Sequence, residues 1–133
     1  HYRIVAPAAL RNEVLKAGWR DLSQLPWIAT PAQHHTQHLL MALFARQGLA
    51  PKQILEADTM AAGESLVRAG LGLTLLREDK AIDLAGKDEL VIWPHARVPA
   101  QLGFIYARST EHDPALVATL SQLRRVWGLS ESA

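Results

Sequence analysis

The stretch Ser65–Leu76 reads SLVRAGLGLTLL and carries the clearest structural signal in the chain. Residues 58–69 are predicted to form a helix, and Gly70 supplies the left-handed conformation that commonly ends one. Gly72 then permits another backbone segment to approach closely where a strand begins. The near-continuous apolar run Leu71–Leu76 is typical of a strand covered on both faces. The stretch therefore predicts a helix that leads directly into a buried strand.

Strand-like and helix-like segments alternate on both sides of this stretch. Short apolar runs bounded by turn-forming residues predict further strands at residues 2–6, 27–29, 53–57, 90–93 and 101–107. Apolar residues at helical spacing predict helices at residues 10–17, 30–48, 77–81 and 113–127. Pro94 is expected to close the strand before it, and residues 19–25 to form a connector. The alternation predicts an α/β fold with a largely parallel sheet flanked by helices.

Composition narrows the class of protein. The 133 residues suffice for one domain with a modest core. Lys plus Arg number 14 and Asp plus Glu 13, so the net charge of +1 shows no electrostatic footprint for nucleic acid. The absence of cysteine excludes disulfides, thiolate metal sites and cysteine nucleophiles. No apolar run approaches the length of a membrane span. Because the chain begins inside a predicted strand and without Met, it is expected to be cut from a longer protein.

Motifs for catalysis are missing from the sequence. It contains no Gly-x-Ser-x-Gly, no phosphate loop and no His-Glu-x-x-His. Glu64 and Ser65 are adjacent on a predicted helix, where neighbouring side chains point in different directions. The Gly70-x-Gly72 pair lacks the third glycine of a dinucleotide fingerprint. We therefore predict no enzyme, no catalytic residue and no cofactor.

A histidine cluster at His34, His35 and His38 allows two interpretations. His34 and His38 are four residues apart and would share a helical face, a spacing that can ligate zinc or nickel. A closed site needs further ligands, and no nearby Asp, Glu or Cys supplies them in sequence. The alternative is an exposed helix surface. We favour the surface and predict no metal site.

Three segments together resemble the effector-sensing domain of LysR-type transcription regulators. Ser65–Leu76 resembles that family's helix, Ala-Gly-x-Gly turn and hydrophobic strand. Asp21–Ile28 resembles its entry into the second lobe, and Phe44–Pro51 the helix end before the next strand there. The chain departs from the family at Leu76-Arg77, where proline is usual, and at Ala8–Leu10, where His-Pro-Leu is common.

The resemblance implies a two-lobed fold of the periplasmic-binding-protein type II. Its implied divisions are a crossover strand at residues 1–7, the second lobe at 8–93, the return crossover at 94–100, and a strand and C-terminal helix of the first lobe at 101–133. It also implies a cytoplasmic regulator that forms homo-oligomers and does not use a membrane. Promoter DNA would be bound by an N-terminal winged helix-turn-helix outside this chain.

In such a fold a small effector, expected to be anionic, lies between the lobes near helix N-termini, which attract negative charge. The alternative function is an extracytoplasmic solute-binding protein of the same fold, which would need a signal peptide. An enzyme on this architecture would need a cluster of titratable groups with perturbed pKa values in the cleft. The sequence offers no such cluster.

Two helix starts are the candidate ligand sites. The first runs from Ala29 to His34 and continues to Thr36, and its expected ligand-binding residues are Thr30, Pro31, Gln33, His34 and Thr36. The second is the turn Thr59–Ala62, where Asp58 or Thr59 can cap the helix, and its expected ligand-binding residues are Thr59 and Met60. Both starts also have an interpretation without a ligand. Thr30 can cap a helix, with Pro31 at the first helical position and Gln33 completing a capping box, and the second start fits simple helix propensity. One residue can serve both roles.

The C-terminal segment is expected to present an unpaired apolar face. Its members come from the predicted strand and final helix: Leu102, Phe104, Tyr106, Leu116, Leu120, Leu123 and Trp127. Most of the sheet they would pack against is not in the chain. We predict that another copy of the chain, or an altered docking of the helix, covers this face.

Overall fold

The computed structural model describes residues 1–129, so the last four residues of the expected segment 101–133 lie outside the described residues. The chain divides into two units, residues 1–100 and residues from 101 onward. No helix in the described part is long and apolar enough to cross a membrane.

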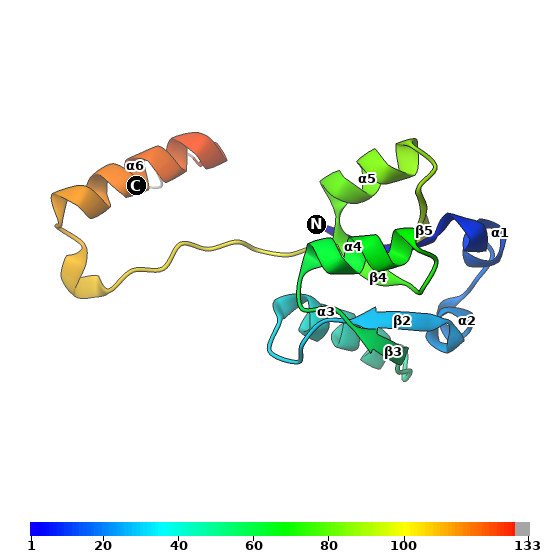
Figure 1. Ribbon diagram of the computed structural model, residues 1–133. Coiled ribbons are helices and arrows are strands. Elements are labelled where there is room, and N and C mark those ends of the chain that lie inside the picture. Colours follow the sequence, from blue (N-terminus) through cyan, green and yellow to red (C-terminus); the bar gives the residue numbers. More distant parts are fainter. Residues whose placement is uncertain (130–133) are drawn as a thin grey trace. The chain divides into compact units, whose positions relative to one another are not determined.

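The first unit alternates strands and helices, which confirms the α/β class (Figure 1). Its elements, in chain order, are β1 (Tyr2–Pro7), the 3₁₀ helix η1 (Ala8–Leu10), α1 (Arg11–Val14), α2 (Trp19–Gln24), β2 (Pro26–Ala29), α3 (His35–Ala45), β3 (Lys52–Glu56), α4 (Met60–Arg68), β4 (Thr74–Arg77), α5 (Glu78–Gly86) and β5 (Leu90–Val98). Residues 19–24, expected to be a connector, form a helix, and the expected turn at 77–81 extends into the longer α5.

The sequence predicted a largely parallel sheet, but the structure contains both parallel and antiparallel strand pairs. β1 lies between β4 and β5 and runs antiparallel to both, whereas β2 and β3 are parallel. A parallel bridge between Trp27 and Leu73 shows that β2 and β4 share a direction. Helical crossovers explain the parallel strands β2, β3 and β4. The pattern of apolar residues does not encode strand direction, so the reversed β1 was not visible in the sequence.

The sequence predicted that β5 ends at Pro94, but the strand continues to Val98. β5 is the edge strand of its sheet, and the register with β1 shifts between Arg3 and Val5, opposite the part of β5 that contains Pro94. Proline is tolerated at edges and bulges because it has no N–H to donate to the ladder. The strand therefore passes through the proline without losing a required hydrogen bond.

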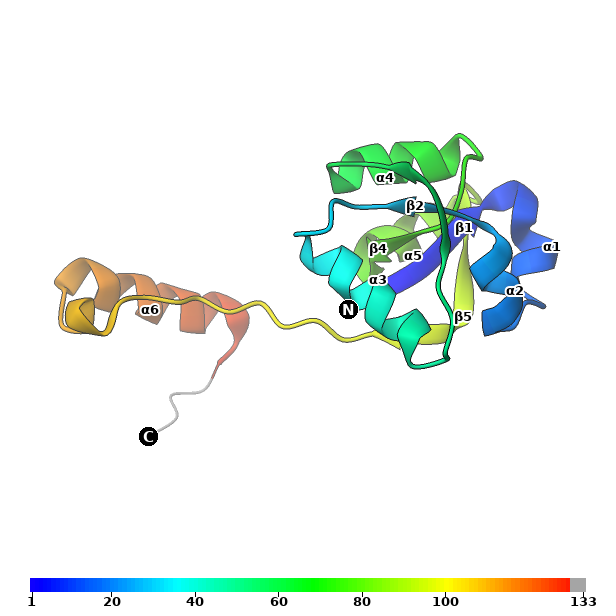
Figure 2. The same cartoon turned by 90° about the horizontal axis from the view of Figure 1, so that it is seen from below.

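The core lies on both faces of β2, because successive strand residues point to opposite sides. Trp27 packs in one buried cluster with Phe44 of α3, and Ile28 in the other with Val67 of α4. The Trp27 ring meets Phe44 edge to face, with centroids 5.1 Å apart, and its Nε1 donates to the Leu22 carbonyl at 2.8 Å. Figures 1 and 2 show α3 and α4 on opposite sides of β2.

The glycines in the deciding stretch act as predicted. Gly70 has a φ of +86° after α4, so a left-handed residue ends that helix. At Gly72, an added Cβ would lie 2.8 Å from the carbonyl oxygen of Pro26. The close backbone approach predicted for Gly72 is therefore confirmed.

The second unit contains η2 (Arg108–Thr110) and α6 (Pro114–Trp127). The Asp113 side chain caps α6 by accepting the Ala115 N–H at 2.8 Å, as its sequence predicted. Residues 101–107 form no strand, which corrects the expectation for this segment. A strand needs a hydrogen-bonded neighbour, and the described part of this unit offers none. No residue of α6 is buried, and what covers its apolar face stays a prediction.

Candidate functional site

The carboxyl ends of β2, β3 and β4 lie at one edge of the first unit, because these strands run in the same direction. At this edge the Ala57 N–H, just after β3, donates to the Ala29 carbonyl at the end of β2 at 2.9 Å. The Thr74 hydroxyl, at the start of β4, donates to the Ile28 carbonyl at 3.1 Å and connects β4 to β2. A helix starts shortly after each strand. In open α/β sheets this edge is where ligands usually bind.

The loop after β2 does not form the helix cap that the sequence predicted. α3 begins at His35 and not at Pro31, and its N-cap His34 makes no side-chain cap bond. Thr30 therefore caps nothing, and no capping box forms with Gln33. A turn comes first, in which the His34 N–H donates to the Pro31 carbonyl at 2.8 Å.

Gln37 explains this later start. Its side chain is only 9% exposed, and its Oε1 accepts the Thr30 N–H at 3.2 Å. The Thr30 and Thr36 hydroxyls also share a hydrogen bond of 3.0 Å. These bonds satisfy the loop without continuing the helix backwards to Pro31, and sequence reasoning did not single out Gln37.

The candidate residues of this loop differ in how deeply they are buried. Thr30 and Thr36 are brought together and half-buried, and Pro31 and His34 are also half-buried, while Gln33 is exposed. The loop can offer hydroxyls, each with hydrogen-bonding capacity beyond the shared bond. His35 and His38 are exposed. Within residues 1–129, no group of three His, Cys, Asp or Glu side chains is placed to hold a metal ion.

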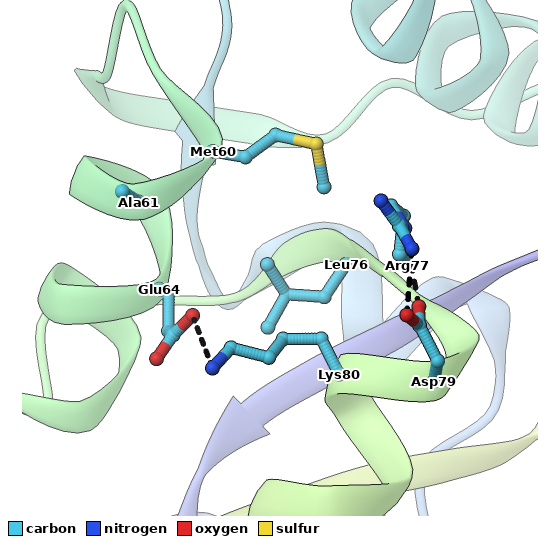
Figure 3. A pocket seen from close by; sticks show the side chains of 7 residues that line it. All are labelled: Met60, Ala61, Glu64, Leu76, Arg77, Asp79 and Lys80. Atoms are coloured by element: carbon cyan, nitrogen blue, oxygen red, sulfur yellow. Dashed lines mark hydrogen bonds and ion pairs between the residues drawn. The ribbon is translucent and has the colours of Figure 1, made fainter.

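A cavity of about 280 Å³ lies at the same edge, beside the second candidate start (Figure 3). Thr59 caps α4 by accepting the Ala62 N–H at 3.1 Å, as predicted, and is exposed. Met60, the next residue, lines the cavity. The full lining is Met60, Ala61, Glu64, Leu76, Arg77, Asp79 and Lys80. The structure thus brings Met60 to this cavity, and none of the candidate residues near Thr30 lines it.

Sequence reasoning missed most of this lining. Arg77 is the last residue of β4, and Asp79 and Lys80 follow it directly, so the rule that ligands bind at the carboxyl ends of strands could have indicated them. Glu64 gave no such signal. It reaches the cavity only because α4 lies beside the start of α5 (Figure 3).

Two ion pairs line the cavity, and they differ in the distance between their charged groups. The Arg77 guanidinium donates to both carboxylate oxygens of Asp79, at 3.1 Å and 2.6 Å, which lowers the pKa of Asp79 below its ordinary value. The Lys80 Nζ lies 3.8 Å from Glu64 Oε2, beyond hydrogen-bond distance. Hydrogen bonds therefore join Arg77 to Asp79. No hydrogen bond joins Lys80 to Glu64, and we call these two residues the open pair.

Glu78, the first residue of α5, connects this helix to the sheet. Its carboxylate accepts two hydrogen bonds of 2.7 Å from Arg97 of β5 and one of 3.3 Å from Arg3 of β1. The hydrogen bonds from Arg97 are the largest cause that lowers the pKa of Glu78 from its ordinary 4.5 to about 2. One carboxylate therefore links the edge of the cavity to the paired strands β1 and β5.

Comparison with known proteins identifies relatives of this arrangement. A family model described as LysR substrate binding domain matches residues 1–128. A search of curated proteins finds no match. Among solved structures, the effector binding domain of QuiR in complex with shikimate is 15% identical with a TM-score of 0.67, and the match covers 95% of this chain and 60% of that one.

Two further structures are similar in the same way. ArgP from Mycobacterium tuberculosis is 17% identical with a TM-score of 0.65, over 93% of this chain and 42% of that one. The regulatory domain of CcmR from Synechocystis in complex with 2-PG is 17% identical with a TM-score of 0.62, over 92% and 62%. The chain thus spans less than two thirds of each of these relatives. At these identities the likeness shows the fold, which is of the periplasmic-binding-protein type II.

Proposed function

This chain belongs to the LysR substrate binding domain family, and on that premise we propose that it senses a small metabolite for a transcription regulator. The cavity at the carboxyl edge of β4 carries this proposal. It combines an apolar floor with a few charged groups, as ligand sites commonly do.

We propose that the metabolite carries an anionic group. The cations Arg77 and Lys80 lie at the cavity, and α4 and α5, whose first turns carry a partial positive charge, begin beside it. The half-buried Thr30 and Thr36, with Pro31, Gln33 and His34, form the neighbouring loop at the same edge. Thr59 and Met60 complete the proposed site. QuiR and BenM, two structural relatives, are described in complex with shikimate and with benzoate, both of which are carboxylates.

The division into lobes stays a proposal. Residues 1–7 and 94–100 would be the crossovers, 8–93 the second lobe, and 101–133 part of the first. The direct pairing of β1 with β5 supports this assignment, because two crossover strands of a hinge would lie side by side. By analogy with the family, we propose a cytoplasmic homo-oligomer that binds promoter DNA through a separate domain. The ligand must bind two states of the regulator unequally, or it shifts nothing.

Thermal melting of this chain against a panel of small carboxylates tests the proposal. A saturable rise in Tm with a compound would support it, since a ligand that binds only the folded state stabilises that state. Met60→Trp, which fills the cavity, should abolish the rise, and Met41→Trp, on the exposed part of α3, should leave it unchanged. A rise that persists in Met60→Trp would contradict the proposed site.

The coding sequence upstream of residue 1 tests the regulatory role. A helix-turn-helix there supports it, and a secretory signal peptide would contradict it in favour of solute binding.

A further inference from the structure

The geometry points to a zwitterion as the ligand of this cavity: a small molecule with an ammonium and a carboxylate group on an apolar body, as in an apolar amino acid. Glu64 would bind the ammonium group and Lys80 the carboxylate. The inference rests on the proposed effector-binding function and narrows its ligand class.

Glu64 has hydrogen-bonding capacity that residues 1–129, the part of the chain that the structure describes, leave unused. Its side chain is 17% exposed, yet its two ion-pair partners are distant: Lys80 Nζ lies 3.8 Å from Oε2, and Arg68 Nη1 lies 3.9 Å from Oε1. Both distances exceed that of a hydrogen bond. Arg68 is engaged by Glu89 through its other terminal nitrogen. A mostly buried carboxylate that lacks close donors gains strongly from a charged donor on a ligand.

Lys80 is the matching cation. Its ammonium group pairs with Glu64 only at 3.8 Å, and its side chain is 51% exposed, so it can turn toward a ligand carboxylate. Arg77 is less free, because Asp79 holds its guanidinium through two hydrogen bonds. The open pair therefore offers one acceptor and one donor side by side in the cavity wall, as Figure 3 shows.

The charge balance of the lining favours a zwitterion over a simple anion. Glu64 and Asp79 offset Arg77 and Lys80, so the lining has no net charge. A simple anion at Lys80 would meet the Glu64 carboxylate at close range, and like charges repel. An ammonium group on the same ligand would attract the Glu64 carboxylate and offset this repulsion.

The remaining lining sets the size and polarity of the ligand. Met60, Ala61 and Leu76 supply apolar surface, and Leu76 is 2% exposed at the floor. A cavity of about 280 Å³ lies just below the usual range for ligand pockets, which starts at about 300 Å³. These features fit an amino acid with an apolar side chain.

Calorimetric titration of this chain with matched compounds tests the inference. The probes are apolar amino acids from alanine to phenylalanine, each with its deaminated acid and its decarboxylated amine; for leucine these are isocaproate and isoamylamine. We expect at least one amino acid to bind with a Kd about tenfold or more below those of both its analogues, the typical gain from a charged hydrogen bond.

Variants assign the two contacts. Glu64→Gln should remove the preference for the amino acid over its deaminated acid, and Lys80→Met should weaken both compounds about tenfold. Lys87→Met is the matched control, because Lys87 follows the end of α5 and pairs with Asp83 at 2.8 Å outside the cavity lining. It should leave the Kd unchanged.

The outcomes separate this inference from the proposed function. Deaminated acids that bind as well as the amino acids, with both weakened by Lys80→Met, would overturn the zwitterion while the effector site stands. Absence of binding by every amino acid would also overturn it, and the carboxylate panel would then decide the proposed function by itself. An unchanged preference in Glu64→Gln would contradict the role of that carboxylate.

Discussion

The backbone N–H of Leu73 donates a 2.8 Å hydrogen bond to the carbonyl oxygen of Pro26, and the Ile28 N–H returns one of 2.8 Å to the Leu73 carbonyl. These bonds attach the glycine-containing stretch to β2 across a long sequence separation. The contact aligns the carboxyl ends of β2 and β4, and so brings the loop at Thr30 and the cavity at Arg77 to one edge.

Gly72→Ala should break this contact. The new Cβ would lie 2.8 Å from the Pro26 oxygen, so backbone must move, and we expect a loss of about 1–3 kcal/mol in the free energy of unfolding. Gly63→Ala is the control, because that Cβ would meet nothing within 4 Å and alanine favours the helix. Urea unfolding measures both; equal stability of the two variants would refute the steric argument.

Glu78→Gln should change the acid sensitivity of the protein. The pKa of Glu78 is lowered from 4.5 to about 2, so its ionised form stabilises the fold fully above pH 4.5. That stabilisation is lost as the pH falls from 4.5 toward 2. The variant should therefore be less stable at neutral pH and show a flatter profile across this window.

Urea unfolding at a series of pH values measures this effect, with the exposed Glu56→Gln as the matched variant. A difference between wild type and Glu78→Gln that stays constant from neutral pH to 2 would show that the ionisation of Glu78 contributes nothing to the free energy of unfolding.

Gln37→Leu should destabilise the loop after β2. It leaves the Thr30 N–H without its partner, at a cost of about 1–3 kcal/mol. Gln33→Leu should change stability little, because Gln33 is exposed and caps no helix. The pair separates the observed loop from the capping box predicted by sequence, which would make Gln33 the more sensitive position. Chemical denaturation of both variants decides between them.

Truncation after Ala100 should leave a folded protein. Both buried clusters consist of residues from the first unit, so their apolar burial is retained. We expect cooperative unfolding with a Tm close to that of the full chain, by circular dichroism. A truncated chain without cooperative unfolding would mean that residues beyond 100 complete the core.

Local chemistry explains which elements the sequence predicted well. Gly70 ends α4, Thr59 caps it and Asp113 caps α6, because each of these roles depends on one residue and its immediate neighbours. The apolar run before Arg77 forms the buried β4 for the same reason: its burial follows from its composition. The family resemblance rested on local motifs, among them the turn at Gly70 and the apolar run after it, and is confirmed over residues 1–128.

Elements that depend on distant partners were predicted less well. α3 starts late because Gln37 reaches back to Thr30, and β5 continues through Pro94 because it is an edge strand opposite an irregular part of β1. Residues 101–107 have strand-like composition, yet form no strand without a neighbour. In each case the competing interaction comes from a residue or a strand whose position the local pattern does not specify.

The candidate site also combines features that local sequence determines with features that depend on distant residues. The sequence by itself determined the α/β class, the end of α4 at Gly70 and its start at Thr59 and Met60, because short-range hydrogen bonding and apolar periodicity are sufficient for these. Only the tertiary structure decided the direction of β1 and the cavity in which Glu64 of α4 meets Lys80 of α5. That meeting depends on how two helices pack beside one strand, and packing is a property of the whole fold.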